Sequence, residues 1–193
     1  MLLTIMRIVQ LCSSTSFTKK QLGFIGLGTM GKHMAGHLAG LTEQQSTLLV
    51  YNRNTEKAVQ HTQAYGSRYS DNLSDIARQC DVIFLSLPTS IESKLIIETL
   101  GPSLKPGATI IDTTSGEPKA TVALHSYLQT FGVELVDCPV SGGPAGAEGG
   151  TLTCMLGGNL KICDEMKPIL DLSFSKKSVY CGPIGSGMHE CDV

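Results

Sequence analysis

Residues 26–31 read Gly26-Leu27-Gly28-Thr29-Met30-Gly31, a G-x-G-x-x-G motif between an apolar run and a helical pattern that continues through Met34 and Leu38. The next apolar run ends at Asn52, so the motif lies in a strand–turn–helix–strand unit. In that setting Gly26 makes the turn, Gly28 lets a pyrophosphate approach the backbone, and Gly31 lets the helix pack on the strand. The helix N-terminus faces the phosphates, which predicts a dinucleotide site. The alternative is a glycine-rich turn without a ligand.

The rest of the chain alternates short apolar runs with helical patterns. Strands are predicted at Leu22–Gly26, Leu48–Asn52, Val82–Leu87, Thr109–Asp112, Val133–Asp137, Leu152–Leu156 and Ser178–Cys181. Apolar residues at helical spacing predict helices from Leu73 to Cys80 and from near Pro118 to Gly132. Strands separated by such helices form βαβ units, so we expect an α/β fold with a doubly wound, mostly parallel Rossmann-type sheet and helices on both faces.

Length and composition bound the function classes. A chain of 193 residues fits one large domain, and 41% hydrophobic residues are ample for a packed core. The net charge of −2 argues against a nucleic-acid partner. No apolar run reaches the roughly 20 residues of a membrane span, so no membrane partner is expected either.

Cysteine and histidine spacings predict no metal site. None of the seven cysteines forms a C-x-x-C pair, and we interpret them as free thiols of a reducing compartment. His33 and His37 have a spacing that can hold zinc, but the residues between them lack the Glu of the metalloprotease motif and no third ligand is evident.

The end of the second predicted strand indicates which dinucleotide binds. An NAD site usually places Asp or Glu there, to bind the ribose 2′-hydroxyl. This chain has Asn52-Arg53-Asn54 instead. Neutral Asn52 does not repel a 2′-phosphate, and the guanidinium of Arg53 can bind one through two hydrogen bonds. We therefore predict NADP, with NAD less favoured. The alternative is a solvated arginine at a strand end.

Residues 1–20 differ from the rest of the chain. They contain Arg7, Lys19 and Lys20 and a Ser/Thr cluster, and the first acidic residue of the chain is Glu43. A basic, serine-rich, acid-free start is typical of mitochondrial transit peptides. Because only one arginine is present, a non-functional N-terminal extension is an equally open interpretation of these residues. The predicted location of the protein is therefore mitochondrial or cytoplasmic.

Four ordered motifs resemble those of the β-hydroxyacid dehydrogenases, the group that contains 3-hydroxyisobutyrate dehydrogenase and is related to 6-phosphogluconate dehydrogenase. The first runs from Phe24 to Ala35. Leu87-Pro88-Thr89 resembles the turn beside the nicotinamide ribose, and 112–118 resembles the segment D-x-S-T-x-x-P. Residues 137–143 resemble the substrate loop D-A-P-V-S-G-G, with Cys138 in place of alanine. Glycine at position 28 favours the hydroxyacid branch over 6-phosphogluconate dehydrogenases, which usually have alanine there.

The resemblance implies an oxidoreductase that transfers hydride between nicotinamide and a small 3-hydroxyacid or a related semialdehyde or oxoacid. It implies substrate-binding residues Ser115, Ser141, Gly142 and Gly143. Ser115 is equally expected as the N-cap of the helix that starts near Pro118. The implied cofactor-binding residues are Phe24, Ile25, Gly26, Leu27, Gly28, Thr29, Met30, Gly31, Asn52, Arg53, Asn54, Leu87, Pro88, Thr89 and Ser115.

One expected catalytic residue is missing. The family places a general acid/base lysine on a helix that begins G-x-G-x-x-x-K, and here this position is Cys191. A cysteine is a poor replacement for that proton transfer, so we expect this chain to be inactive. We expect an NADP-binding domain at 21–184 and an aberrant start of the family's helical domain at 185–193. A homo-oligomer is expected only if that helical domain is present. The alternative is a non-catalytic NADP-binding or interaction module.

Overall fold

The computed structural model describes residues 20–42 and 48–190. Residues 1–19 of the predicted N-terminal extension and Cys191, at the position of the family lysine, lie outside the described residues. Within these ranges, no helix is long and apolar enough to cross a membrane.

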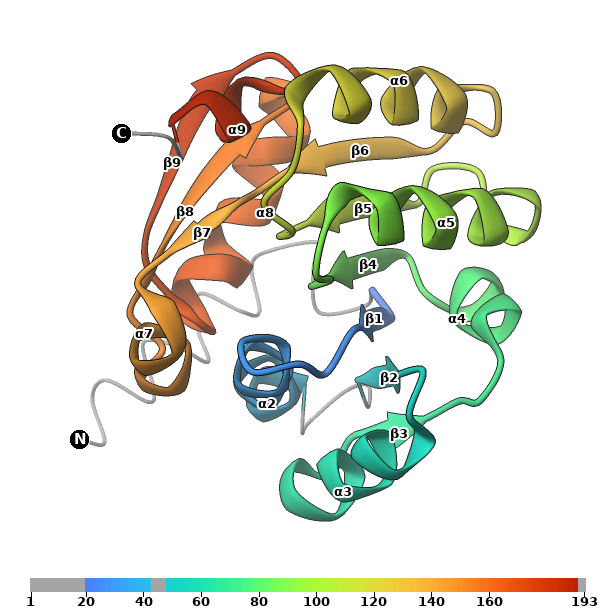
Figure 1. Cartoon of the computed structure of the whole chain (residues 1–193), viewed down its shortest axis with the longest axis vertical. Coiled ribbons are helices and arrows are strands. Elements are labelled where there is room, and N and C mark those ends of the chain that lie inside the picture. The colour runs from blue at the N-terminus through green and yellow to red at the C-terminus, as the bar shows by residue number, and fades with distance from the viewer. Residues whose placement is uncertain (1–19, 43–47, 191–193) are drawn as a thin grey trace.

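A nine-stranded sheet forms the centre of the protein, in the order β3-β2-β1-β4-β5-β6-β8-β7 with β9 beside β8 (Figure 1). Strands β1 to β6 are parallel, as in a doubly wound Rossmann sheet. Strand β8 runs antiparallel to β6 and β7 and parallel to β9. The predicted fold class is confirmed. The strands are β1 Leu22–Ile25, β2 Leu49–Tyr51, β3 Arg68–Tyr69, β4 Val82–Leu85, β5 Thr109–Asp112, β6 Glu134–Asp137, β7 Val140–Ser141, β8 Leu152–Gly157 and β9 Ser175–Gly182.

All seven predicted strands are present, with ends that differ by up to three residues. The largest difference is at β9, which begins at Ser175 and not at Ser178. The sequence pattern missed the first residues of this strand because the exposed Lys176 and Lys177 interrupt its apolar run. Strands β3 and β7 were not predicted, because two residues are too few to show an alternating pattern.

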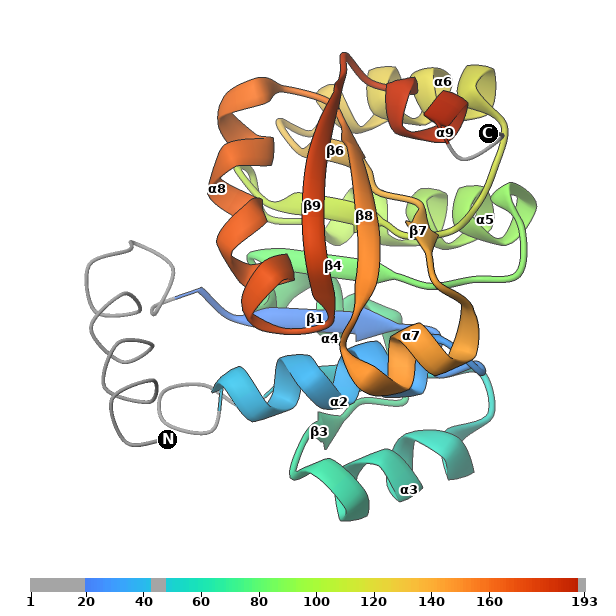
Figure 2. The ribbon, with the colours of Figure 1, turned by 90° about the vertical axis from the view of Figure 1, so that its left-hand side faces the viewer.

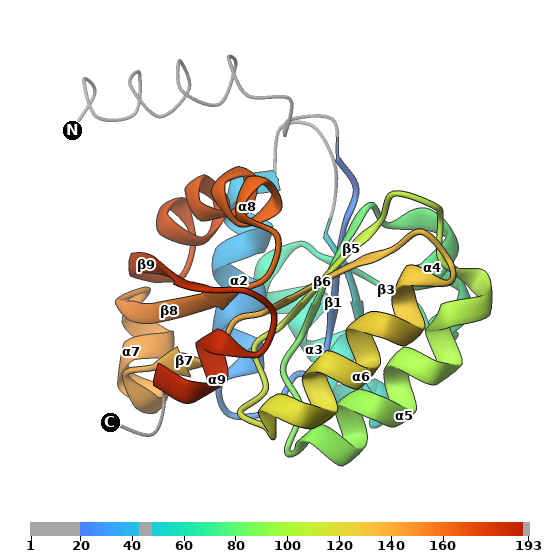
Figure 3. The same ribbon diagram turned by 90° about the horizontal axis from the view of Figure 1, so that it is seen from above.

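Helices cover both faces of the sheet. Figure 3 shows α2 and α8 on one side and α4, α5 and α6 on the other. The predicted start of α6 at Pro118 is confirmed, and Gly132, with a φ of 67°, follows shortly after its end. The helices are α2 Gly31–Thr42, α3 Thr55–Tyr65, α4 Leu73–Gln79, α5 Ser90–Leu100, α6 Pro118–Gln129, α7 Gly143–Gly149, α8 Leu160–Leu172 and α9 Ser186–Glu190, with a 3₁₀ turn at Gly101–Ser103.

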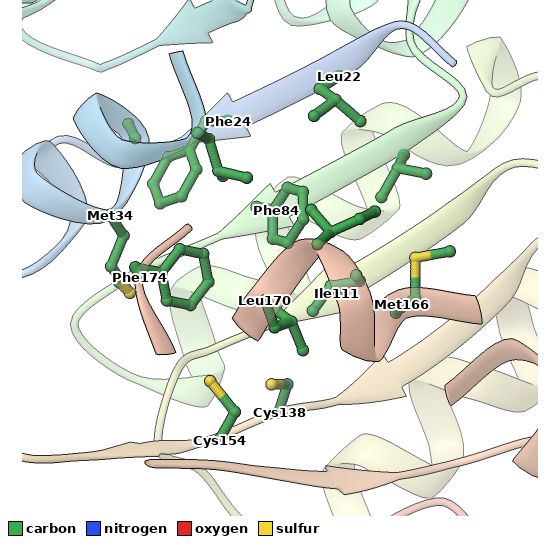
Figure 4. Packing of buried hydrophobic residues seen from close by; sticks show 14 of the residues in the cluster. Leu22, Phe24, Met34, Phe84, Ile111, Cys138, Cys154, Met166, Leu170 and Phe174 are labelled. Carbon is green, nitrogen blue, oxygen red and sulfur yellow. The ribbon is translucent and has the colours of Figure 1, made fainter. Parts of the chain in front are cut away.

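The central strands are buried on both sides, because successive side chains point to opposite faces of a sheet. Toward α2 and α8, the rings of Phe24 and Phe84 stack with centroids 6.1 Å apart, and Phe174 meets Phe84 edge-on at 6.2 Å (Figure 4). Toward α4, α5 and α6, the neighbouring residues Ile25 and Ile83 join a second core. The two cores bury the central strands on both faces. The carboxyl ends of the parallel strands place the loops after β1, β2, β4, β5 and β6 along one edge.

Candidate functional site

The turn between β1 and α2 has a backbone that requires two of its glycines. Gly26 adopts a φ of 101°, and a Cβ on it would lie 2.2 Å from the carbonyl oxygen of Ser86. A Cβ on Gly31 would lie 1.9 Å from the carbonyl oxygen of Gly26. Gly26 therefore serves the turn, and Gly31 serves the close approach of α2 to it.

The outer surface of the same turn is open to a ligand. Gly28 is exposed, and a Cβ on it would meet no atom within 4 Å. Within residues 20–42 and 48–190, no hydrogen bond engages the backbone N–H groups of Gly28, Thr29 and Met30. Free donors at the N-terminus of a helix are the groups that bind a pyrophosphate, so the turn fits a dinucleotide.

Three predicted cofactor residues have side chains inside the protein. Phe24 is 0% exposed, Ile25 1% and Leu27 2%. The N–H of Leu27 donates to the side-chain oxygen of Asn52, over 2.9 Å. These residues hold the turn in place, and a cofactor would meet their backbone rather than their side chains.

The three residues after β2 divide into two that build structure and one that faces outward. Asn52 also donates from Nδ2 to the carbonyl oxygen of Asn54. Asn54 caps α3, because its side-chain oxygen accepts from the N–H of Glu56. Arg53 is exposed and makes no hydrogen bond or ion pair within the described part of the chain. Arg53 is therefore the member of this trio that is free to bind a ligand.

A carboxylate lies near Arg53. Glu92, in the first turn of α5, accepts a hydrogen bond from the hydroxyl of Thr89. That bond is the main cause that lowers the pKa of Glu92, and the positive charge of Arg53 contributes a smaller part. The loop after β4, which contains Thr89, is thereby close enough to the end of β2 for their charges to interact.

A cavity of about 350 Å³ lies between α2 and α3, which contact each other in the lower half of the molecule as drawn in Figures 1 and 2. We call it the α2–α3 cavity. Three residues that line this cavity, Lys32, Lys57 and His61, were not among the site residues predicted from the sequence. The two lysines could have been predicted, because one directly follows the glycine motif and the other lies four residues after Arg53. The cavity is lined by Leu27, Gly28, Thr29, Lys32, Lys57, Gln60, His61, Ala64 and Tyr65.

The loops after β4 and β5 lie against each other. The N–H of Leu87 donates to the hydroxyl of Thr114 over 3.0 Å. Thr89 caps α5 by accepting from the N–H of Ile91. Ser115 is exposed and is not a helix cap, because Glu117 is the N-cap of α6 and makes no side-chain cap bond. The N-cap interpretation of Ser115 was wrong, since the chain extends two residues further before it turns into the helix.

The predicted substrate loop follows β6. Ser141 is exposed and pairs with β8, and Gly142 and Gly143 have φ values of 134° and 63°. The next helix, α7, lies beside α2 in Figure 2, and His37 of α2 joins them. Its Nε2 lies 3.1 and 3.0 Å from two carbonyl oxygens in the last turn of α7. His37 thus connects α7, the helix after the predicted substrate loop, to α2.

Asp137, the first residue of the substrate motif, holds the start of α9. Its side chain is fully buried, and its two oxygens accept from the N–H groups of Gly185, at 2.7 Å, and Met188, at 3.2 Å. Gly187 leaves room for this carboxylate, because a Cβ there would lie 2.7 Å from Oδ2. Burial raises the pKa of Asp137 and of Asp112, and the charge of Asp137 adds to the rise at Asp112.

Comparison with known proteins agrees with this geometry. Residues 21–182 match the family described as the NAD binding domain of 6-phosphogluconate dehydrogenase. The 2-(hydroxymethyl)glutarate dehydrogenase of Eubacterium barkeri is 35% identical over 176 residues, which are 86% of this chain and 55% of that protein. The probable mitochondrial 3-hydroxyisobutyrate dehydrogenase of Dictyostelium discoideum is 32% identical over 177 residues, 90% of this chain and 53% of the relative.

Solved structures show the same fold. Psf3, solved in complex with NADP+ and 2-OPP, has a TM-score of 0.77 and 25% identity, and the match covers 88% of this chain and 60% of Psf3. The chain spans somewhat over half the length of the curated relatives that it matches. The resemblance drawn from the sequence motifs is confirmed: this chain belongs to the family of NAD-binding domains of the 6-phosphogluconate dehydrogenase type, and its relatives include 3-hydroxyisobutyrate dehydrogenases.

Proposed function

We propose that the protein binds NADP(H) in preference to NAD(H). The observation that carries this proposal is the exposed guanidinium of Arg53, which makes no ion pair within residues 20–42 and 48–190 and lies beside the neutral side chain of Asn52 at the end of β2. Lys57 adds a second cation nearby, in the first turn of the helix that follows. The NADP+ complex of Psf3 supports the choice.

Titration of NADPH and NADH into the protein and into Arg53→Ala tests this. A charge-assisted hydrogen bond contributes about 1.5–3 kcal/mol, which corresponds to about ten- to a hundredfold in affinity. Arg53→Ala should lose that factor for NADPH and little for NADH. Equal affinities of the starting protein for the two cofactors would overturn the proposal.

The chemistry we propose for the whole protein is hydride transfer between this cofactor and a small 3-hydroxyacid, or a related semialdehyde or oxoacid. The cofactor donates or accepts the hydride, and the residues of this chain bind the cofactor and the substrate and orient them. Ser115, Ser141, Gly142 and Gly143 would bind the substrate carboxylate through hydroxyl and backbone N–H donors. The names of the two dehydrogenase relatives support this substrate class. Titration of 3-hydroxyisobutyrate into the complex of the protein with NADP+, and into the same complex of Ser141→Ala, tests the substrate class by calorimetry. We expect binding that Ser141→Ala weakens, and no binding to the original protein would contradict the proposal.

A second function, a non-catalytic NADP-binding module, is favoured by one observation. The position that resembles the family's general acid/base lysine is Cys191. Loss of a positioned acid/base removes about 10²–10⁴ in rate. We therefore expect this chain to oxidise 3-hydroxyisobutyrate negligibly while it binds cofactor. Turnover at the rate of an ordinary dehydrogenase, followed by NADPH absorbance, would contradict this.

The cellular location is proposed as mitochondrial or cytoplasmic. The Dictyostelium discoideum relative is a mitochondrial protein by name, and residues 1–20 of this chain have the composition of a transit peptide. Import into isolated mitochondria, with and without residues 1–20, distinguishes the two locations. A homo-oligomer is expected only together with a helical domain.

A further inference from the structure

The helix after the predicted substrate loop has little apolar anchoring of its own. Helix α7 runs only from Gly143 to Gly149, and isolated helices of such length are not stable in water. Of its side chains, only the methyl group of Ala147 is buried, since the other buried residue is Gly146. Burial of a single methyl group contributes little to holding a helix in place. We therefore expect polar contacts with neighbouring elements to fix the position of α7.

His37 of α2 makes such a contact at the last turn of α7. Its Nε2 lies 3.1 Å from the carbonyl oxygen of Ala147 and 3.0 Å from that of Glu148. Both partners are acceptors, so Nε2 carries a proton and donates it to them. The last carbonyl groups of a helix lack partners within that helix, and here a side chain of another helix supplies the donor.

The turn that ends α7 lies directly against the imidazole. Gly150, the C-cap of α7, has a φ of 64°. A Cβ on Gly150 would lie 3.3 Å from Cε1 and 3.4 Å from Nε2 of His37. The contact between His37 and the end of α7 therefore includes close packing as well as hydrogen bonds.

This contact joins the helix of the cofactor turn to the helix of the substrate loop. Helix α2 begins at Gly31, the last glycine of the turn, and α7 begins at Gly143, the last residue of the predicted substrate loop. Figure 2 shows the two helices beside each other. The distance from Gly143 to Glu148 is only about 7.5 Å along a helix. Because so short a helix moves as a unit, the place of its last turn against α2 also decides where its first residue lies.

We propose that His37 is a positioning residue for substrate binding, because it holds α7 against α2 and thereby places Ser141, Gly142 and Gly143 relative to a cofactor at the glycine turn. The proposal rests on the proposed function, in which these three residues bind the carboxylate of a small 3-hydroxyacid. His37 acts on the substrate through α7. Its loss should therefore weaken substrate binding and leave cofactor binding nearly unchanged.

His37→Ala and His37→Gln test the proposal, with His125→Ala as a matched control. The side-chain nitrogen of glutamine has two protons and can donate to both carbonyl oxygens, so His37→Gln keeps the contact. His125 is also a partly buried histidine with polar partners, but it lies on α6 beside Glu134. Glu134 is the first residue of β6, whereas the substrate loop follows the last residue of that strand.

Calorimetric titration of 3-hydroxyisobutyrate into the NADP+ complex of each protein measures the effect on substrate binding. His37→Ala should weaken this binding about five- to tenfold, the loss expected for one hydrogen-bonded contact, and keep the affinity for NADP+ within about twofold. His37→Gln should bind 3-hydroxyisobutyrate within about twofold of the original protein. His125→Ala should change neither affinity.

Three results would overturn the proposal. Substrate binding that His37→Ala leaves unchanged would show that the contact with α7 does not position the loop. An equal loss in His37→Gln would show that donation to the two carbonyl oxygens is not the cause. An equal loss of affinity for NADP+ and for 3-hydroxyisobutyrate would show a general disturbance of the fold.

Amide hydrogen exchange of the cofactor-free proteins separates this inference from the proposed function. The N–H groups of Gly146, Gly150 and Thr151 form hydrogen bonds in and directly after α7, and they should exchange about fivefold faster in His37→Ala but not in His37→Gln. Unchanged exchange in His37→Ala would overturn the inference. No binding of 3-hydroxyisobutyrate to the original complex would instead overturn the proposed function, and the exchange rates would still decide whether His37 holds α7.

Discussion

The side-chain oxygen of Asn52 lies 2.9 Å from the backbone nitrogen of Leu27, and this hydrogen bond joins the end of β2 to the glycine turn. The side-chain nitrogen Nδ2 of Asn52 donates a second hydrogen bond to the carbonyl oxygen of Asn54, and these two atoms are 2.9 Å apart. Asn52 therefore does more than avoid repelling a 2′-phosphate: the oxygen and the nitrogen of its side-chain amide hold the glycine turn, the end of β2 and the start of α3 in one arrangement. An aspartate could accept from Leu27, but in its ionised form it could not donate to Asn54.

Asn52→Asp should reverse the cofactor preference. The new carboxylate repels the 2′-phosphate and can bind a ribose 2′-hydroxyl, so NADPH binding should fall by about tenfold or more while NADH binding is kept or improved. Loss of the bond to Asn54 should lower the free energy of unfolding by about 0.5–1.5 kcal/mol. Fluorescence titration with both cofactors measures the first effect. Asn72→Asp, the same change at the N-cap of α4, is the control and should alter neither cofactor's affinity.

Two glycines of the turn should respond in opposite ways. Gly31→Ala places a Cβ 1.9 Å from a backbone oxygen, so we expect a loss of about 2–3 kcal/mol in the free energy of unfolding. Gly28→Val extends into open space and should change stability by less than about 1 kcal/mol. Its side chain would block the pyrophosphate, however, and lower affinity for both cofactors by about tenfold or more. Urea unfolding and cofactor titration of each variant measure these effects. Equal destabilisation by both substitutions would refute this account of the turn.

Asp137 should make stability depend on pH. Burial raises its native pKa above the ordinary value of 3.8, so as pH rises past that value the unfolded chain loses this proton while the native protein keeps it. The contribution of Asp137 to stability is therefore full below the ordinary pKa and declines as pH rises to the raised pKa. The stability advantage of the original protein over Asp137→Asn should shrink across that window. Urea unfolding at a series of pH values measures it, and an advantage that grows with pH would show a carboxylate stabilised in the native state.

The described cysteines should differ in reactivity. Burial raises the pKa of Cys80 and of Cys163 to about 12, and both side chains are 0% exposed. Cys181 is partly exposed. Because the thiolate is the reactive form, iodoacetamide should modify Cys181 in the native protein and reach Cys80 and Cys163 only on unfolding. Peptide mass spectrometry after timed labelling checks the order. Early labelling of Cys80 would mean that the helical layer of α4 and α5 opens readily.

Local sequence determined much of this protein. The apolar runs predicted β1 to β9 except for the two-residue strands, and Pro118 marked the start of α6, because these elements arise from short-range periodicity and backbone restrictions. The glycine spacing likewise predicted the turn after β1, because the backbone there excludes side chains. The family resemblance followed from motifs that lie in order along the chain.

Tertiary packing decided which groups of the site are free. Asn52, Arg53 and Asn54 are adjacent in the chain, yet only the folded structure shows that the two asparagines are used internally and Arg53 is not. Lys32 and His61 meet at one cavity because α2 packs against α3, and Ser115 is not a cap because the loop after β5 continues to Glu117. Sequence patterns record which residues face inward within one element. They do not record which side chains of two elements meet, because that depends on how the sheet twists and the helices dock.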